Sequence, residues 1–498
     1  MWLDCMEIPN GSVFETEVCI IGAGAVGIAV ARELVAAARD VVLVESGRFE
    51  YDQEVQDLYR GREQGDLLAG KDEYLTSTRL RYFGGTTNHW HGWCRRLDPE
   101  DFAAREWVPN SGWPFPRSEL SAYYDRACEV VQIEPFGDAG QEKERDQPPL
   151  FESDEAFETT LLRLSPPTRF GLVYRHDLIA AERAQLLTSG TVTQFLVDPD
   201  ARWVHGVEIT TLDGRRMEVR AKRYVLATGA IENARLLLAS NRVQRDGLGN
   251  GRDLVGRYFM EHPMTRACFV VVPGRRRMMR LYDEGYKSPG HRVVGVLRTG
   301  PELQERQRIF NSLFVLHRLR LSETPPPLAA EVGRLAAGWQ GGAANRSSHT
   351  YSAFVTVHAE QHPNPESRVR LARDRDALGV PRTRLDWRLS DLDARSLSLA
   401  TEQLVQHLGA TGRGRGLVFI NPEEPWLRTQ ASPHQAGTTR MHDDPTRGVV
   451  DRHGRVHGID NLWIGGGSLF PTAGCSNPTL TVVALALRLA DRLAEMPA

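Results

Sequence analysis

The feature that most constrains the fold of this chain is a glycine-rich stretch near its start. Apolar residues 18–21 predict a buried parallel strand, and Gly22-Ala23-Gly24-Ala25-Val26-Gly27 follows directly. A helical pattern then runs to Leu34, and a second apolar run at 41–44 ends in Glu45. Strand, G-x-G-x-x-G, helix, strand and acid in this order are the fingerprint of a Rossmann-like dinucleotide-binding unit.

Each fixed position of the fingerprint has a physical role. Gly22 permits the tight turn after the strand, Gly24 lets the backbone approach a pyrophosphate, and Gly27 lets the helix pack on the strand. Glu45 would accept hydrogen bonds from the adenosine ribose. The fingerprint alone does not separate NAD from FAD.

The rest of the chain favours FAD. The other glycine-rich candidate, residues 247–251, follows polar residues and is predicted to be a loop, so we find no second fingerprint. Residues 224–230 are predicted instead to form a strand that ends in a small-residue turn, followed by a helix over 231–239. Many flavoproteins that carry this fingerprint have a similar element, which returns beside the first strand. One dinucleotide held by several separated segments suits FAD better than NAD.

Composition predicts an ordinary globular protein. The chain has 498 residues, more than one typical domain, and a formal net charge of −3, which gives no reason to expect nucleic acid or an anionic membrane as a partner. No apolar run approaches the length of a membrane helix, and residues 1–5 lack a signal-peptide pattern. The six cysteines form no C-x-x-C pair, which argues against an iron–sulfur cluster, a zinc ribbon or a disulfide framework. We therefore expect a reduced, cytoplasmic protein.

Two residues near the carboxyl end do not indicate a function individually, but they do when considered together. A single histidine such as His434 is more often structural than catalytic. Asn477 before Pro478 predicts an ordinary helix start, with Asn477 as the N-cap and Pro478 as the first helical residue. In a chain that opens with a dinucleotide fingerprint, however, His434 and Asn477 fit the base and the hydrogen-bond partner of a flavin alcohol oxidoreductase.

From its fingerprint to its final helix the chain resembles the glucose–methanol–choline (GMC) oxidoreductase family. The resemblance also rests on Phe83-Gly84-Gly85-Thr86-Thr87-Asn88-His89-Trp90 and on segments 254–263, 360–369 and 461–471. The His/Asn pair is similar to that of the pyranose-oxidase and cholesterol-oxidase branches. The fold it implies is an α/β, Rossmann-like FAD-binding domain of the p-hydroxybenzoate-hydroxylase-like type with an α+β substrate domain built on a large antiparallel sheet.

The implied domain organisation divides the chain into three sections. Residues 14–263 would form the first part of the FAD-binding domain, with an inserted helical or loop segment at about 100–185. Residues 264–430 would form the substrate-binding domain. Residues 431–498 would return to the FAD-binding domain and carry the catalytic pair.

Sequence patterns within the substrate section support a sheet. Alternating stretches at 293–297, 310–319 and 351–357 predict antiparallel strands. Residues 322–348 are rich in Pro, Ala and Gly and resemble a mobile connection or a lid. In segment 254–263, we interpret His262 as a structural marker rather than a catalyst.

The resemblance assigns cofactor contacts to residues spread over the whole chain. In the family the Gly-Gly turn at 84–85 passes along the flavin, where small residues let the backbone cross a flat aromatic surface. His89 stands where the pyranose-oxidase branch carries a histidine covalently bound to the flavin; the alternative is a noncovalent His89 packed beside Trp90. A metal site at His89 and His91 lacks a third ligand at suitable spacing. The expected cofactor contacts are Gly22, Gly24, Ala25, Val26, Gly27, Glu45, Ser46, Gly84, Gly85, Thr86, Asn88, His89, Trp90, Val192, Ala227, Thr228, Gly229, Asn233, Gly467, Ser468, Asn477, Pro478 and Thr479.

The implied reaction is oxidation of a CH–OH group of a sugar, amino sugar or similar polyol, with hydride transfer to flavin N5. It needs a base near neutral pKa, which suits the imidazole of His434, while Asn477 would orient the substrate oxygen. The positive end of the helix starting at Pro478 would oppose the negative charge of the reduced flavin. The electron acceptor would be O2 or a redox partner. Two alternatives stay open: a redox-silent, FAD-containing lyase of the same family, and a non-catalytic flavin electron-transfer subunit.

Overall fold

The computed structural model describes residues 1–65, 73–136, 149–151, 156–272, 278–283, 286–288, 291–319, 329–331, 333–334, 351–421, 423–426 and 429–497. The predicted lid at 322–348 lies outside the described residues, apart from 329–331 and 333–334. In the described part of the chain, no helix is long and apolar enough to cross a membrane.

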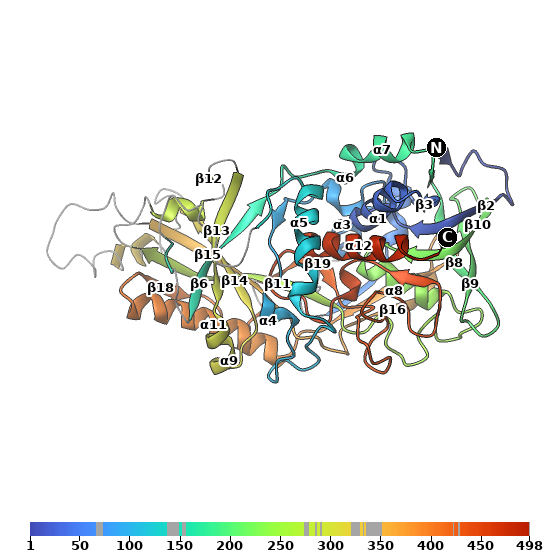
Figure 1. Cartoon of the computed structure of the whole chain (residues 1–498). Coiled ribbons are helices and arrows are strands. Elements are labelled where there is room, and N and C mark those ends of the chain that lie inside the picture. Colours follow the sequence, from blue (N-terminus) through green and yellow to red (C-terminus); the bar gives the residue numbers. More distant parts are fainter. Residues whose placement is uncertain are drawn as a thin grey trace.

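An eight-stranded sheet at one end of the molecule contains the N-terminal fingerprint (Figure 1). Its centre is formed by β3 (Val41–Val44), β2 (Val13–Ile21) and β10 (Arg216–Leu226), which run parallel. The predicted return of the strand near 224 beside the first strand is confirmed, because Tyr224 of β10 pairs with Cys19 of β2. The strand order is β1-β7-β3-β2-β10-β9-β8, with β20 beside β10. The outer strands are β1 (Trp2–Asp4), β7 (Ala184–Thr188), β8 (Thr191–Val197), β9 (Val204–Thr210) and β20 (Leu462–Ile464).

Helix α1 (Ala25–Ala36) leads away from the fingerprint and packs against the last helix, α12 (Thr479–Ala494). Both helices bury a wide apolar face, and each large aliphatic side chain removed from water contributes roughly 1.5–3 kcal/mol. Helix α5 (Ser121–Val130) also packs against α12, and its Arg126 forms ion pairs with Glu33 of α1 and Asp491 of α12, so the three helices meet (Figure 1). This packing brings the last residues of the chain to the end of α1, where the guanidinium of Arg39 donates to the carbonyls of Ala494 and Met496.

A nine-stranded sheet forms the other end of the molecule (Figure 1). Its order is β18-β11-β15-β14-β13-β6-β5, with β12 beside β13 and β19 beside β11. The three predicted strands in the substrate section are confirmed as β13, β14 and β15, which pair antiparallel. The strands are β5 (Trp93–Cys94), β6 (Phe157–Leu164), β11 (Met260–Val272), β12 (Lys287–Ser288), β13 (His291–Thr299), β14 (Ser312–Arg318), β15 (Tyr351–Ala359), β18 (Arg415–Val418) and β19 (Thr429–Ala436).

Helix α11 (Asp391–Ala410) covers one face of this sheet. Its N-terminus is fixed by a capping box between Ser390 and Asp393. The buried residues of the helix repeat at intervals of three and four, so they form one stripe that faces the strands. The stripe consists of Leu397, Ala400, Leu404 and Leu408.

Several elements connect the two large sheets. Strands β5 and β6 belong to the antiparallel sheet although they precede residue 264. A small sheet joins β4 (Arg62–Gly65) to β17 (Pro381–Trp387) and β16 (Arg368–Arg375). The remaining short elements are α2 (Gln53–Gln56), η1 (Asp57–Tyr59), α3 (Tyr74–Ser77), η2 (Gly85–Asn88), α4 (Pro99–Phe102), η3 (Arg117–Leu120), α6 (Phe170–Val173), α7 (Arg175–Ala180), α8 (Ala230–Ala239), η4 (Met278–Tyr282), α9 (Pro301–Gln307) and η7 (Gly467–Leu469).

Candidate active site

A cavity of about 1690 Å³ lies between the two large sheets and is lined by residues from both. Pockets for drug-sized ligands measure roughly 300–1,000 Å³, so this cavity has room for a larger ligand. One end is lined by the dinucleotide fingerprint, and the other by side chains of β11 and β15. The predicted catalytic residues His434 and Asn477 also line it.

The fingerprint is arranged as a cradle at the start of α1. Gly22 has a φ of +99°, and a Cβ on Gly27 would lie only 1.8 Å from the carbonyl oxygen of Gly22. A Cβ on Gly24 would instead enter open space, with no described atom within 4 Å. The backbone at Gly24 is therefore accessible from the cavity, and the first turn of α1 presents its positive end there. This geometry fits the diphosphate of a dinucleotide.

Glu45 lies at the end of β3, on the wall beside this cradle. Its carboxylate accepts hydrogen bonds from the backbone nitrogens of Ala23 (2.8 Å) and Gly47 (3.1 Å). Burial raises the pKa of Glu45, while these two N–H donors and the charge of Arg81 oppose that rise. The carboxyl group is thus held rigidly at the place where the fingerprint predicts contact with a ribose.

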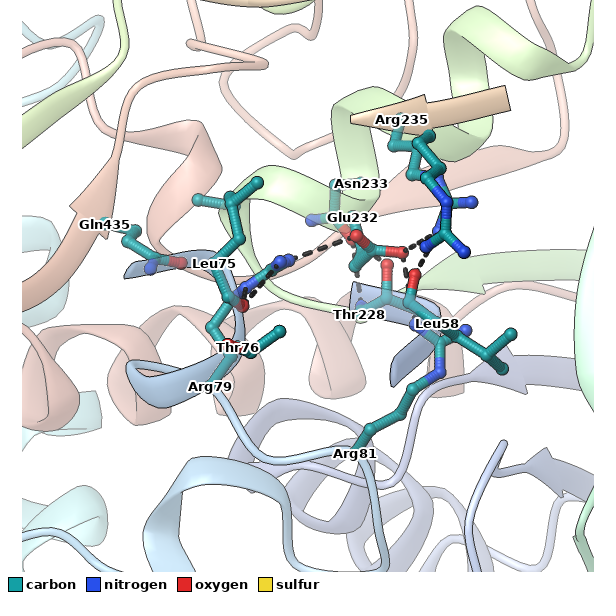
Figure 2. Close-up of polar contacts among 12 residues, drawn as sticks. Leu58, Leu75, Thr76, Arg79, Arg81, Thr228, Glu232, Asn233, Arg235 and Gln435 are labelled. Carbon is teal, nitrogen blue, oxygen red and sulfur yellow. Dashed lines mark hydrogen bonds and ion pairs between the residues drawn. The ribbon is translucent and has the colours of Figure 1, made fainter. Parts of the chain in front are cut away.

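A buried ion-pair network adjoins this end of the cavity, and the sequence did not indicate it. Figure 2 shows Arg79 and Arg235 reaching Glu232 of α8 from opposite sides, at 3.0 and 3.1 Å. Arg81 forms a third ion pair with Glu232 at 3.2 Å and also donates a hydrogen bond to Ser46. These three arginines lower the pKa of the buried Glu232 to about 2, so it stays ionised. Arg79, Arg81 and Glu232 all line the cavity.

The Gly-Gly turn lies directly against the fingerprint. Gly84 and Gly85 have φ values of +95° and +53°, and a Cβ on Gly85 would lie 3.1 Å from the Cα of Gly24. His89 follows η2 on the cavity wall and is exposed, with its pKa lowered by partial burial and by nearby cations. The indole nitrogen of Trp90 donates to the carbonyl of Thr168 at 2.9 Å. Among the described residues, no group of three or more His, Cys, Asp or Glu side chains is arranged to hold a metal ion.

The predicted catalytic pair meets at the centre of the cavity. Nε2 of His434, on β19, lies 3.1 Å from Nδ2 of Asn477. The expectation that Asn477 caps the helix is wrong: α12 begins at Thr479, Pro478 occupies the N-cap position, and the Asn477 amide is directed to His434 instead. The N-terminus of α12 still reaches the cavity through Pro478 and Thr479.

The surroundings of His434 keep its ring neutral. Burial lowers the pKa of His434 well below the ordinary value, and the neighbouring rings of His262 and His358 lower it further. The Nδ1 atoms of His434 and His262 lie 3.0 Å apart. The backbone nitrogen of His434 donates to the Glu261 carboxyl at 2.8 Å, and the hydroxyl of Tyr74 donates to the same group. A neutral imidazole can accept a proton, as a base must, but the pKa of His434 lies below the near-neutral value expected from the sequence, because the ring is buried.

Most predicted cofactor contacts line the cavity, but five lie behind its wall. Asn233 accepts a hydrogen bond from the backbone nitrogen of Thr228 (2.9 Å) and donates to the hydroxyl of Ser468 (2.9 Å), so this pair braces two wall segments. Asn88 donates to the carbonyl of Phe83 and holds the Gly-Gly turn. The five residues behind the wall are Gly27, Gly84, Asn88, Asn233 and Ser468.

The substrate end of the cavity is formed by one face of β11 and β15. Met264 pairs with His358, and Arg266 pairs with Thr356. Alternate residues of β15 (Phe354, Thr356 and His358) line the cavity, together with Met264, Thr265 and Arg266 of β11. The guanidinium of Arg266 lies 5.5 Å from the ring centre of Phe354. Sequence reasoning missed these residues because the alternation identifies a face only after the strand pairing is known. Arg318 and Trp93 complete this end.

Comparison with known proteins relates this geometry to a family. Residues 173–264 and 363–486 match the two sequence profiles described as GMC oxidoreductase. The chain is 29% identical to paromamine 6'-oxidase from Streptomyces fradiae, over 96% of this chain and 91% of that protein. It is 23% identical to the fructose dehydrogenase large subunit from Gluconobacter japonicus, over 97% and 98% of the two chains. The solved structure of pyridoxine 4-oxidase from Mesorbium loti covers 97% of this chain and 100% of its own, with a TM-score of 0.58 and 15% identity. The predicted fold class is confirmed.

Proposed function

Since this chain belongs to the GMC oxidoreductase family, we propose that it oxidises a CH–OH group of a sugar, amino sugar or similar polyol, with FAD as the oxidant and His434 as the base. Membership makes the chain an oxidase or dehydrogenase acting on alcohols, and the family points to FAD. The names of two relatives, paromamine 6'-oxidase and fructose dehydrogenase, support a sugar or amino sugar. The observation that carries the proposal is the 3.1 Å contact between His434 and Asn477 in the cavity that also holds the fingerprint.

The proposed oxidation removes a proton and a hydride from the substrate alcohol. The substrate hydroxyl takes the place of the Asn477 amide at Nε2 of the neutral His434, which receives the hydroxyl proton, and the displaced amide donates a hydrogen bond to the substrate oxygen. When bound, FAD supplies the two-electron acceptor for the hydride that leaves the carbinol carbon, and its electrons pass later to O2 or a redox partner. Loss of one proton and one hydride turns the alcohol into a carbonyl compound.

Residues around the cradle would hold the cofactor. The accessible backbone at Gly24 and the first turn of α1 would bind the diphosphate, and the Glu45 carboxylate would accept from the ribose hydroxyls. The start of α12 at Pro478 and Thr479 would place its positive end against the isoalloxazine, where charge develops on reduction.

An anaerobic screen tests the proposal. Purified protein is mixed with sugars, amino sugars and simple polyols, and loss of oxidised-flavin absorbance is recorded before oxygen is admitted. We expect at least one of these alcohols to bleach the flavin, and His434→Ala to slow bleaching by about 10²- to 10⁴-fold while FAD remains bound. A yellow protein that no alcohol bleaches would support the lyase or the electron-transfer subunit instead. Bleaching at the wild-type rate by His434→Ala would remove the base assignment.

His89 is the residue at which a covalent link to the flavin would form. Its position on the cavity wall, just after the Gly-Gly turn, supports this part of the proposal. After acid precipitation, a covalent flavin stays with the polypeptide, and a flavin-bearing peptide then contains His89. Release of all the flavin into the supernatant would show that His89 packs without a bond, and FAD as the cofactor would be unaffected.

A further inference from the structure

We propose that His262 sets the tautomer of His434 and so keeps an unprotonated nitrogen facing the substrate. The inference rests on the proposed role of His434 as base. It gives His262 a positioning role, in place of the structural marker that the sequence suggested.

The hydrogen-bond chain fixes the direction of each proton. Two neutral imidazole nitrogens 3.0 Å apart must share one proton, so one Nδ1 donates and the other accepts. On the far side of the His434 ring, Nδ2 of Asn477 lies 3.1 Å from Nε2. An amide NH2 group only donates, so Nε2 must be the acceptor and carries no proton. The proton of His434 therefore sits on Nδ1 and is donated to Nδ1 of His262.

The strand geometry explains why His262 reaches this position. Strands β11 and β19 pair antiparallel, and their register shifts between Met260 and His262. Such an irregularity re-aims side chains, and here two consecutive residues of β11 contact one residue of β19. Glu261 accepts from the backbone nitrogen of His434, while His262 contacts its ring. The base is thus held at its backbone and at its ring by neighbouring residues.

The charges around the pair favour a neutral partner over a carboxylate. His262 is fully buried, and burial lowers its pKa to about 4. Burial raises the pKa of Glu261 to about 8, which disfavours its charged form, and its two oxygens accept from Tyr74 and from the backbone nitrogen of His434. The pKa of His358, the third ring nearby, is lowered to about 3, and Glu360 is engaged by Arg105. Among the described residues, no carboxylate forms a hydrogen bond or ion pair with the His434 ring, whose hydrogen-bond partners are His262 and Asn477, so His262 is its acceptor.

Two substitutions separate tautomer control from packing. His262→Phe keeps an aromatic ring but removes the acceptor, whereas His262→Asn places a carbonyl oxygen close to the position of Nδ1. We expect His262→Phe to lower the rate of anaerobic flavin reduction by about 10- to 100-fold at unchanged FAD content, as for other orienting partners of histidine. The apparent substrate affinity should change little, and His262→Asn should recover most of the rate. Equal losses in both variants, or an unchanged rate in His262→Phe, would overturn the proposal.

A spectroscopic measurement gives a readout that does not depend on turnover. In wild-type protein containing ring-15N histidine, the His434 signals, assigned by their loss in His434→Ala, should show a protonated Nδ1 and an unprotonated Nε2. A protonated Nε2 in the wild type would refute the inference even if the His262 variants fail to fold. If His434→Ala reduces flavin at the wild-type rate, the proposed function fails. If it is slow and His262→Phe is not, only the present inference fails.

Discussion

At the scale of single residues, one contact within the proposed site was predictable and another was not. His434 and Asn477 were recognisable only as a pair, in a chain that opens with a dinucleotide fingerprint, and the structure places their side chains 3.1 Å apart. His262 lies 172 positions before His434, and only the pairing of β11 with β19 brings them together. A strand register of this kind leaves no local trace in sequence.

The direction of the Asn477 side chain changes what its removal should do. Because Pro478 is the N-cap of α12 and Asn477 faces His434, Asn477→Ala should reduce the flavin-reduction rate, by less than His434→Ala does. Its thermal midpoint should stay close to that of the wild type. Differential scanning fluorimetry and anaerobic stopped-flow on the same preparation measure the two quantities. Loss of a true cap costs about 1 kcal/mol, so destabilisation of that size would show that Asn477 supports the helix after all.

At the scale of helices and strands, prediction succeeded where a local pattern decides the outcome. Strands β2 and β3 and helices α1 and α8 follow from apolar periods and from glycine positions. The start of α12 was misplaced because a tertiary contact captured the Asn477 side chain that would otherwise have capped the helix. At this position the hydrogen bond to His434 outweighs the local preference of Asn477 for the N-cap.

Substitutions at two glycines of the fingerprint should have different effects. Gly24→Val should leave the fold intact but abolish FAD retention, because its side chain would enter the open space of the cradle. Gly27→Val should prevent correct folding, since its Cβ alone would lie 1.8 Å from the Gly22 oxygen. Flavin absorbance per polypeptide and circular dichroism distinguish the two results. A stoichiometric, yellow Gly24→Val protein would contradict the assigned role of this backbone.

The ion pairs of α8 make a pH-dependent contribution to stability. The pKa of Glu232 is about 2 in the folded protein and near its ordinary value of 4.5 when unfolded. Its stabilisation is therefore complete above about pH 4.5 and is lost as the pH falls towards 2, amounting to at most about 3 kcal/mol. Glu232→Gln should unfold at a lower denaturant concentration than the wild type at pH 7. The difference between the two unfolding midpoints should become smaller below pH 4.5. A difference between the midpoints that stays constant down to pH 3 would contradict this account.

At the scale of the whole molecule, the two kinds of sheet were predictable but their membership was not. The large antiparallel sheet recruits β5 and β6 from the first third of the chain, and the small sheet joins β4 to β17 across more than 300 residues. A contiguous range such as 264–430 describes neither sheet completely. Strands with distant partners carry the same alternation as any others, so sequence alone does not say which sheet they join.

Arginine side chains also give the substrate end of the cavity a positive charge. Arg266 and Arg318 line this end, where Arg318 also forms an ion pair with Asp283 at 3.9 Å, whereas the carboxylates in the described lining, Glu45 and Glu232, lie at the opposite end. A cleft with one sign of charge draws counter-charged molecules in by long-range attraction that salt weakens. Of three sugars with the same reacting hydroxyl, kcat/KM should fall with added salt for a uronate, stay level for the neutral sugar and rise for the amino sugar. Arg266→Gln should weaken the salt dependence of kcat/KM for the uronate and for the amino sugar. The same salt dependence for all three sugars would show that charge does not affect substrate binding.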